Sequence, residues 1–131
     1  MNELCACGSN RIVGQCCESI IEGKRDATTA EELMRSRYVA FTKADVNYLM
    51  RSHHSKTRPM KDRKNIEHWA KSVQWMGLVI LSTEAGEVND NQGVFEFRAL
   101  YVENGKLEGI HEKSLFERED GKWVYTSGEH Y

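Results

Sequence analysis

The fold of this chain is decided by residues 93–127, GVFEFRALYVENGKLEGIHEKSLFEREDGKWVYTS. Apolar and polar side chains alternate through this stretch with a period of two, which is typical of half-buried β-strands. The alternation is broken at ENGK and at EDGK, short turn sequences that join antiparallel neighbours. We therefore expect a meander of three strands, over about residues 93–103, 107–119 and 122–128.

The residues before this meander predict the rest of the fold. A further strand over about residues 76–85 is joined to the meander by the turn sequence EVNDNQG. Helix-favouring, amphipathic sequence comes before that strand, and helices are expected over about residues 30–42, within 43–54, and over 64–73. Because the helices precede strands that are linked by short turns, we predict an α+β domain with its helices on one face of an antiparallel sheet.

An arginine interrupts the apolar stripe of the first expected helix. The helix opens with a capping box, either Thr28 with Glu31 or Thr29 with Glu32. Projected at about 100° per residue, Arg37 falls in the middle of the apolar stripe. Its guanidinium could reach the rim or form a structural ion pair, or it could contact an anion or substrate in a cavity. The stripe consists of Ala30, Leu33, Met34, Tyr38 and Phe41.

A carboxylate lies on the apolar face of the third expected strand. Glu112 shares that face with Ile110, Ser114 and Phe116, so it needs hydrogen bonds, a positive partner or a proton. We predict that Arg37 and Glu112 approach each other across the helix–sheet interface. The pair would be structural, whereas a Glu112 that lined an open cavity with a raised pKa would be a candidate general base.

All four cysteines lie within CACGSNRIVGQCC, residues 5–17. In a reducing compartment, clustered cysteines are more often metal ligands or redox groups than disulfides, although pairing across the loop after oxidation is an alternative. Iron–sulfur clusters have other spacings. Four thiolates complete a tetrahedral zinc shell with no open position, so we predict one structural Zn²⁺. The expected ligands are Cys5, Cys7, Cys16 and Cys17.

Composition indicates an ordinary globular protein. The chain has 131 residues, 40% hydrophobic and 29% charged, with a net charge of -2. No window approaches the roughly 18 apolar residues of a membrane span, and a secretory signal is absent, so we expect a cytoplasmic location. The segment from Lys43 to Lys71 contains eight basic residues and only three acidic ones. This excess indicates either solvated helix faces or a weak nucleic-acid binding surface.

Two blocks of the sequence resemble a known family. CACGSNRIVGQCC resembles the SEC-C zinc motif at the C-terminus of the SecA translocation ATPase, with Ala6 in place of the usual proline. LMRSRYVAF, residues 33–41, resembles the signature helix of the YchJ-like family of bacterial proteins. YLMRSHH, WMGL, GIHEKSLF and GKWVYTSG also fall where that family has similar blocks.

The resemblance implies a two-part organisation. Residues 1–27 would form the zinc knuckle, with the four cysteines as ligands. Residues 28–131 would form a cone-shaped domain like nuclear transport factor two (cystatin-like), in which a curved antiparallel sheet wraps around the helices.

Three functions fit this organisation. The first in rank is an adaptor whose knuckle docks onto a protein partner, as the related motif does in SecA. The second is an isomerase- or dehydratase-like enzyme that uses the cone cavity, and the third is a nucleic-acid- or ribosome-associated factor. A deep cavity would favour the enzyme, and a cone plugged by side chains would favour the adaptor. The expected cavity residues are Arg37, Tyr38, Trp75, Phe97, Glu112 and Ser114.

Overall fold

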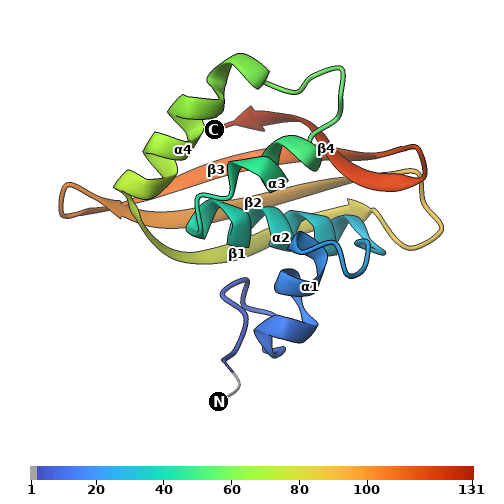
Figure 1. Ribbon diagram of the computed structural model, residues 1–131, viewed down its shortest axis with the longest axis horizontal. Coiled ribbons are helices and arrows are strands. Elements are labelled where there is room, and N and C mark those ends of the chain that lie inside the picture. Colours follow the sequence, from blue (N-terminus) through green and yellow to red (C-terminus); the bar gives the residue numbers. More distant parts are fainter. Residues whose placement is uncertain (1–2) are drawn as a thin grey trace.

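The computed structural model describes residues 3–131 as helices packed against one face of a four-stranded sheet (Figure 1). The helices are α1 (Cys17–Ile21), α2 (Ala30–Thr42), α3 (Val46–Arg51) and α4 (Arg63–Ser72), with the 3-10 turns η1 (Val13–Gln15) and η2 (Met60–Asp62). The strands are β1 (Gln74–Ala85), β2 (Gln92–Glu103), β3 (Lys106–Glu119) and β4 (Lys122–His130). The predicted α+β class is confirmed.

The sheet is the predicted meander, with strand order β1-β2-β3-β4 and every neighbouring pair antiparallel. Two of its turns have positive φ at both central residues, Asn104–Gly105 and Asp120–Gly121. This is the geometry of the type I′ turn, whose twist matches that of the flanking strands. The short turn sequences therefore fix the register of β2 on β3 and of β3 on β4.

Register shifts bend the sheet. They occur in β1 between Trp75 and Gly77 and between Ile80 and Ser82, and where β3 meets β4 between Leu115 and Phe116. An extra residue on one strand increases local twist and curves the ladder. The resulting concave face receives α2, with α3 and α4 beyond it (Figure 1).

Helix α2 forms the centre of the core. Thr29 is its N-cap and accepts a hydrogen bond from the Glu32 amide, which is one half of the second predicted capping box. The Glu32 carboxylate accepts from the amide and hydroxyl of Thr28 instead of from the Thr29 amide. Four of the five residues of the predicted apolar stripe are buried, and Phe41, near the end of the helix, is partly buried. One core cluster joins Ala30, Leu33 and Met34 of α2 to Phe95, Phe116 and Trp123 of the strands.

The loop after β1 lies close to the start of β2 at two glycines, Gly86 and Gly93. A Cβ added to Gly93 would lie 2.6 Å from the Gly86 Cα and 2.9 Å from the Gly86 nitrogen. The Gly86 carbonyl also accepts a hydrogen bond from the first amide of α2, at Ala30. The absence of side chains therefore lets the β1–β2 loop reach the start of the central helix.

Helix α4 covers one end of the concave face. Its Trp69 packs edge-on against Trp75 of β1 and Tyr101 of β2, with ring centroids 5.3 Å away in both cases. Within residues 3–131, no helix is long and apolar enough to cross a membrane.

Candidate functional site

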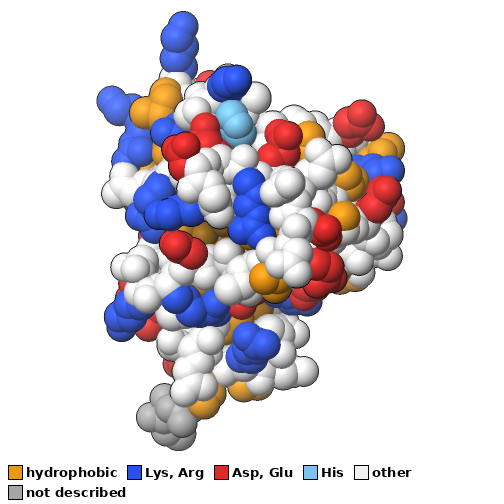
Figure 2. Space-filling model, turned by 90° about the vertical axis from the view of Figure 1, so that its right-hand side faces the viewer, with side chains coloured by type: hydrophobic (Ala, Val, Ile, Leu, Met, Phe, Trp, Pro, Cys, Tyr) orange, Lys and Arg blue, Asp and Glu red, His pale blue; other side chains and the backbone are white. Residues whose placement is uncertain are grey.

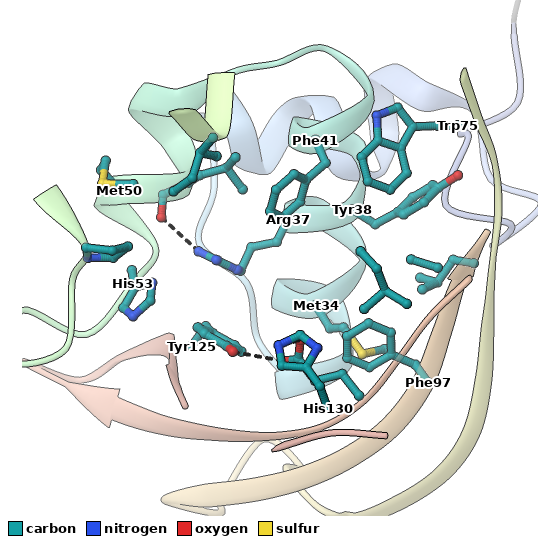
Figure 3. Close-up of a pocket in the computed structure, with 17 residues that line it drawn as sticks. Met34, Arg37, Tyr38, Phe41, Met50, His53, Trp75, Phe97, Tyr125 and His130 are labelled. Atoms are coloured by element: carbon teal, nitrogen blue, oxygen red, sulfur yellow. Dashed lines mark hydrogen bonds and ion pairs between the residues drawn. The ribbon is translucent and has the colours of Figure 1, made fainter. Parts of the chain in front are cut away.

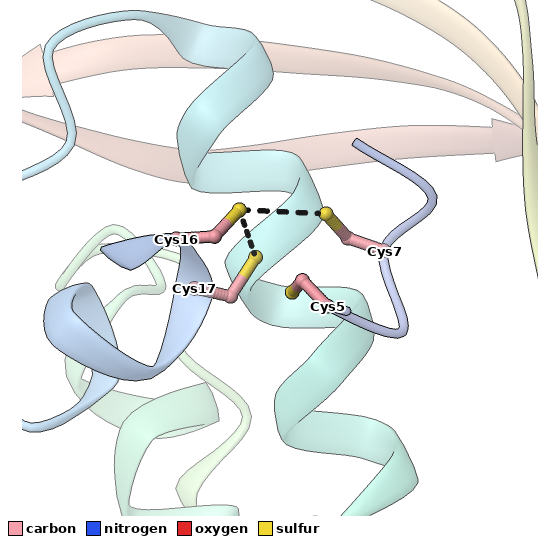
Figure 4. Close-up of side chains that lie close together, drawn as sticks. All are labelled: Cys5, Cys7, Cys16 and Cys17. Carbon is pink, nitrogen blue, oxygen red and sulfur yellow. Dashed lines mark hydrogen bonds between the residues drawn. The ribbon is translucent and has the colours of Figure 1, made fainter. Parts of the chain in front are cut away.

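The four cysteines converge in one buried cluster. The four sulfur atoms all lie within 4.8 Å of one another. Cys5 and Cys7 belong to the N-terminal loop, whereas Cys16 and Cys17 lie at the start of α1 (Figure 4). The sulfurs of Cys7 and Cys16 are 3.7 Å apart, far beyond the roughly 2.05 Å of a disulfide bond. All four thiols are free, and the donor set is that of a closed metal site.

A small hairpin brings the two cysteine pairs together. Leu4 pairs with Ile12, and the Cys5 amide donates to the Arg11 carbonyl at 2.8 Å. Gly8 turns the chain with a φ of 85°, a conformation that favours glycine. The loop therefore folds back on itself and presents Cys5 and Cys7 to the start of α1.

Without a cation, the four sulfurs cannot all be thiolates at the same time. A hydrogen bond from Cys17 lowers the pKa of Cys7 to about 4, and the same bond, followed by burial, raises the pKa of Cys17. Ser9 also places its hydroxyl 3.2 Å from the Cys16 sulfur. Four thiolates packed this closely repel one another, so a bound cation is what would make them compatible.

The cysteine cluster is built into the core of the domain. Its sulfurs share a buried cluster with Tyr38 and Val39 of α2. Arg35, also on α2, donates to the Cys7 carbonyl and forms an ion pair with Glu31 at 2.9 Å. The knuckle is therefore packed on the central helix and is not a tethered appendage.

A pocket of about 270 Å³ lies between the concave face of the sheet and helices α2, α3 and α4. Figure 3 shows that Phe41, Trp75 and Phe97 form an apolar part of its wall, whereas Arg37, His53 and Tyr125 gather at another part. Of the six predicted cavity residues, the structure places five in the lining, and these are Arg37, Tyr38, Trp75, Phe97 and Glu112.

Arg37 is held rigidly in this pocket. Its Nη1 donates to the Leu49 carbonyl at 2.8 Å and to the Ser52 hydroxyl at 2.7 Å, while its guanidinium lies 4.7 Å from the centre of the Tyr125 ring. Burial lowers the pKa of Arg37 to about 10, so the side chain stays charged at neutral pH.

The predicted contact between Arg37 and Glu112 is not made by these two described residues, and that prediction is wrong. Tyr125 lies between them: its ring faces Arg37 and its hydroxyl donates to Glu112 Oε2 at 2.8 Å. Ser114 also donates to Oε2, and Oε1 lies 3.3 Å from His130 Nε2. Ser114 is wholly buried behind Glu112 and does not line the pocket, a second correction.

Gly128 makes room for this carboxylate. A Cβ at position 128 would lie 2.6 Å from Glu112 Cδ and 2.7 Å from the Tyr125 hydroxyl, while the φ of Gly128 is one that any residue adopts. We expect Gly128→Ala to displace both groups and to lower the free energy of unfolding by about 2 kcal/mol, because overpacking forces them off their preferred positions. Urea denaturation measures the loss. Ser127→Ala, at an exposed neighbouring position, serves as the control, and equal stability of the two variants would contradict the crowding.

His53 faces the same polar part of the pocket as a neutral imidazole. Burial, followed by the charges of Arg37 and Arg58, lowers its pKa from 6.5 to about 4. Below pH 6.5 the unfolded chain therefore binds a proton that the folded chain does not, and the free energy of unfolding falls as the pH drops from 6.5 towards 4.

We expect the lowered pKa of His53 to reduce the free energy of unfolding by about 2 kcal/mol between pH 7 and pH 5. Chemical denaturation at pH 7 and at pH 5 measures the change in the free energy of unfolding. This change should be about 2 kcal/mol larger for the wild type than for His53→Gln. Comparing the two proteins cancels the acid sensitivity of all other groups. Identical losses would show that His53 is protonated equally easily in both states.

Three residues of the polar part were not predicted as site residues: His53, Tyr125 and His130. His53 lies within the stretch of the second predicted helix, residues 43–54, but nothing in the sequence ties it to Arg37. His130 was missed because β4 was expected to end at residue 128. The strand continues to His130, which pairs in register with Glu112.

Comparison with known proteins places this arrangement in a family. Residues 29–128 match the family described as the YchJ middle NTF2-like domain. The chain belongs to this YchJ-like family. A UPF0225 protein from Geobacter sulfurreducens is 43% identical to it over 128 residues, covering 98% of this chain and 80% of that protein. The resemblance inferred from the cysteine stretch and residues 33–41 is confirmed.

Solved structures agree with this YchJ-like assignment. The solution structure of a SEC-C motif containing protein from Rhodopseudomonas palustris matches with a TM-score of 0.87 at 28% identity, covering 98% of this chain and 99% of that one. The crystal structure of a SEC-C motif containing protein from Psychrobacter arcticus matches with a TM-score of 0.81 at 26% identity, covering 95% and 81%. Both structures match over at least 95% of this chain, in agreement with the predicted curved-sheet domain preceded by a small cysteine knuckle.

Proposed function

We propose that this protein binds a small molecule in the pocket of its cone domain and is stabilised by a structural Zn²⁺ ion at its N-terminal knuckle. The observation that carries the proposal is the pocket itself, a space of about 270 Å³ at the centre of the domain that the described side chains leave unfilled. Most of its lining is apolar, with a few convergent polar groups, which is the usual composition of a ligand site. If side chains had filled this space, the structure would instead have favoured the adaptor function, which was the first of the three functions expected from the sequence.

Binding is favoured over catalysis by the state of Glu112. Both of its carboxylate oxygens already have partners, because Oε2 accepts from Ser114 and Tyr125 and Oε1 faces His130. A general base needs an oxygen that can reach a substrate proton. The isomerase- or dehydratase-like alternative, with Glu112 and Arg37 as its candidate catalytic residues, is therefore the weaker use of the same pocket.

The metal proposal rests on four sulfur donors, Cys5, Cys7, Cys16 and Cys17, which lie close enough to share one ion. Zn²⁺ favours four thiolates in a closed tetrahedral shell, and such a site supports structure instead of supplying a reactive water. We expect one zinc per chain in protein purified without added metal. Residues 1–27 and 28–131 are accordingly proposed as the metal-binding and pocket-forming parts.

The pocket is tested by NMR titration of the full chain with one-ring compounds of negative, zero and positive charge. We expect at least one class to bind saturably and to shift the amide signals of pocket residues such as Trp75. Ala99→Ile, which adds bulk at a buried wall position, should abolish the shifts, whereas Thr83→Ile at an exposed position should leave them intact. No binding by any class, or undiminished binding to a folded Ala99→Ile, would overturn the proposal.

A second function, docking of a protein partner by the knuckle, is supported by the outer side of its hairpin. Leu4 is 62% exposed there and Arg11 is also exposed, while the cysteines face inward. Affinity capture should compare the intact chain with Leu4→Ser/Arg11→Ala, because this variant keeps every cysteine. Recovery of the same partners by both proteins would remove the docking role.

The nucleic-acid alternative has less support. On the face drawn in Figure 2, lysine and arginine side chains are interspersed with aspartate and glutamate and form no continuous basic surface. An electrostatic nucleic-acid footprint requires basic groups gathered on one face. A cytoplasmic location stays a proposal that rests on the sequence alone.

A further inference from the structure

We infer that the pocket takes a small organic acid, a carboxylate on a compact apolar body such as a single aromatic ring, with the carboxylate bound by Arg37. The inference rests on the proposed function, because it names the ligand class of the same pocket.

The guanidinium of Arg37 offers an unused binding edge. An arginine has five N–H donors, and the two on Nη1 are taken by the Leu49 carbonyl and the Ser52 hydroxyl. Among the described residues, the Nε and Nη2 groups have no acceptor, and Arg37 has no carboxylate partner. The Nε and Nη2 edge of a guanidinium matches the two oxygens of a carboxylate, which it binds through two parallel hydrogen bonds.

The position of this edge is fixed before any ligand arrives. Ser52, which accepts from Arg37, donates its own hydroxyl proton to the Tyr48 carbonyl at 2.7 Å, and the Tyr125 ring covers one face of the guanidinium. An arginine held in this way loses little side-chain entropy when it binds an anion. The structure therefore presents a preorganised cation in an apolar cavity, where attraction to an anion is stronger than in water.

The nearby charges leave Arg37 as the dominant attraction for an anion. Glu112 is turned towards Ser114 and Gly128, and Tyr125 separates it from the guanidinium. His53 is neutral at pH 7 and adds no charge. A carboxylate can consequently approach Arg37 from the cavity, which Glu112 also lines with its oxygens already bonded by Ser114 and Tyr125 and facing His130.

The rest of the lining determines what the carboxylate is attached to. Trp75 packs against Tyr38 and Phe41, with ring centroids 6.0 Å and 5.7 Å away, and Leu78 and Phe97 add further apolar surface. About 270 Å³ is slightly below the usual range for drug-sized ligands, so one ring or a branched alkyl group fits and an extended polar molecule does not. Sugars and nucleotides are disfavoured because most of their hydroxyl and phosphate groups would be unpaired.

The test uses three probes of nearly equal shape, phenylacetate, phenylacetamide and phenethylamine, titrated into the full zinc-loaded chain at pH 7. We expect phenylacetate to bind at least about tenfold more tightly than phenylacetamide, and phenethylamine to bind most weakly. Equal affinity for the three probes, or a preference for the amide or the amine, would overturn the inference while leaving the pocket as a ligand site. No binding by any of the three would count against the pocket itself.

Variants of Arg37 assign the preference to one side chain. Arg37→Met should remove the difference between phenylacetate and phenylacetamide, whereas Arg37→Lys, which keeps the charge but not the two-pronged edge, should reduce it. The matched control is Arg98→Met, because Arg98 is exposed on the same sheet and does not line the pocket. An undiminished preference in the folded Arg37→Lys and Arg37→Met variants would contradict the assignment. If Arg37→Met does not fold, the comparison of Arg37→Lys with Arg98→Met still decides the question.

Discussion

Removal of the metal proposed at the four cysteines is expected to destabilise the whole described domain and not only residues 3–21. Structural zinc contributes about 10 kcal/mol or more of apparent binding free energy in isolated metal modules, and a loss of roughly 5 kcal/mol in unfolding free energy is expected here. The reason lies in the packing, because the four cysteines share a buried cluster with Tyr38 and Val39 of the central helix. Without the cation, the sulfurs would separate and the surface of α2 beneath them would become exposed.

Hydrogen exchange and thermal unfolding with and without a chelator measure this effect. We expect faster exchange in α1, in α2 and in the N-terminal hairpin, and a lower midpoint in the chelated protein and in Cys16→Ser/Cys17→Ser. Ser9→Ala is the control, because Ser9 contacts a sulfur without being a ligand, and it should change the midpoint only slightly. Unchanged exchange in α2 after metal removal would show that the cone is independent of the knuckle.

Gly93→Ala is expected to lower the free energy of unfolding by about 3 kcal/mol, the upper end of the cost of overpacking. The added Cβ would meet the Gly86 Cα at 2.6 Å and the Gly86 nitrogen at 2.9 Å, and neither backbone atom can rotate away as a side chain would. The strain would pass to α2, because the Gly86 carbonyl holds the first amide of that helix.

Gly109→Ala provides a matched control for this substitution. At that position the Cβ would meet only the end of a flexible side chain, Leu100 Cδ2, at 3.2 Å. Urea denaturation should therefore separate the two variants by about 2 kcal/mol or more. Similar midpoints would show that the β1–β2 contact adjusts more easily than the geometry indicates.

The fold was predictable because its information is local. Period-two alternation defined the strands, and Asn104–Gly105 and Asp120–Gly121 defined tight turns, so short-range signals were enough to order the sheet. The position of Arg37 on the apolar stripe and of Glu112 on the inner face of β3 followed from the same periodicity. In the structure, both residues line the pocket.

The contacts within the site were not predictable, because they depend on geometry between distant segments. Which group stands between Arg37 and Glu112 depends on the register of β4 and on the direction of the Tyr125 side chain. The volume of the pocket depends on the curvature of the sheet. This curvature arises from register shifts, which cannot be predicted from the type of any one residue. For the same reason, alternation showed that Ser114 faces inward but not that it lies behind Glu112.

The packing of the knuckle on α2 also bears on how the chain can be divided. Tyr38 and Val39, only 6% and 2% exposed, belong to the sequence of the cone but are buried partly by the cysteine cluster. A chain truncated before residue 28 would present this apolar surface to water, and exposed patches of that kind promote self-association. Although the knuckle and the cone are distinct in sequence, they should melt in a single cooperative transition, and neither half should be a soluble monomer alone.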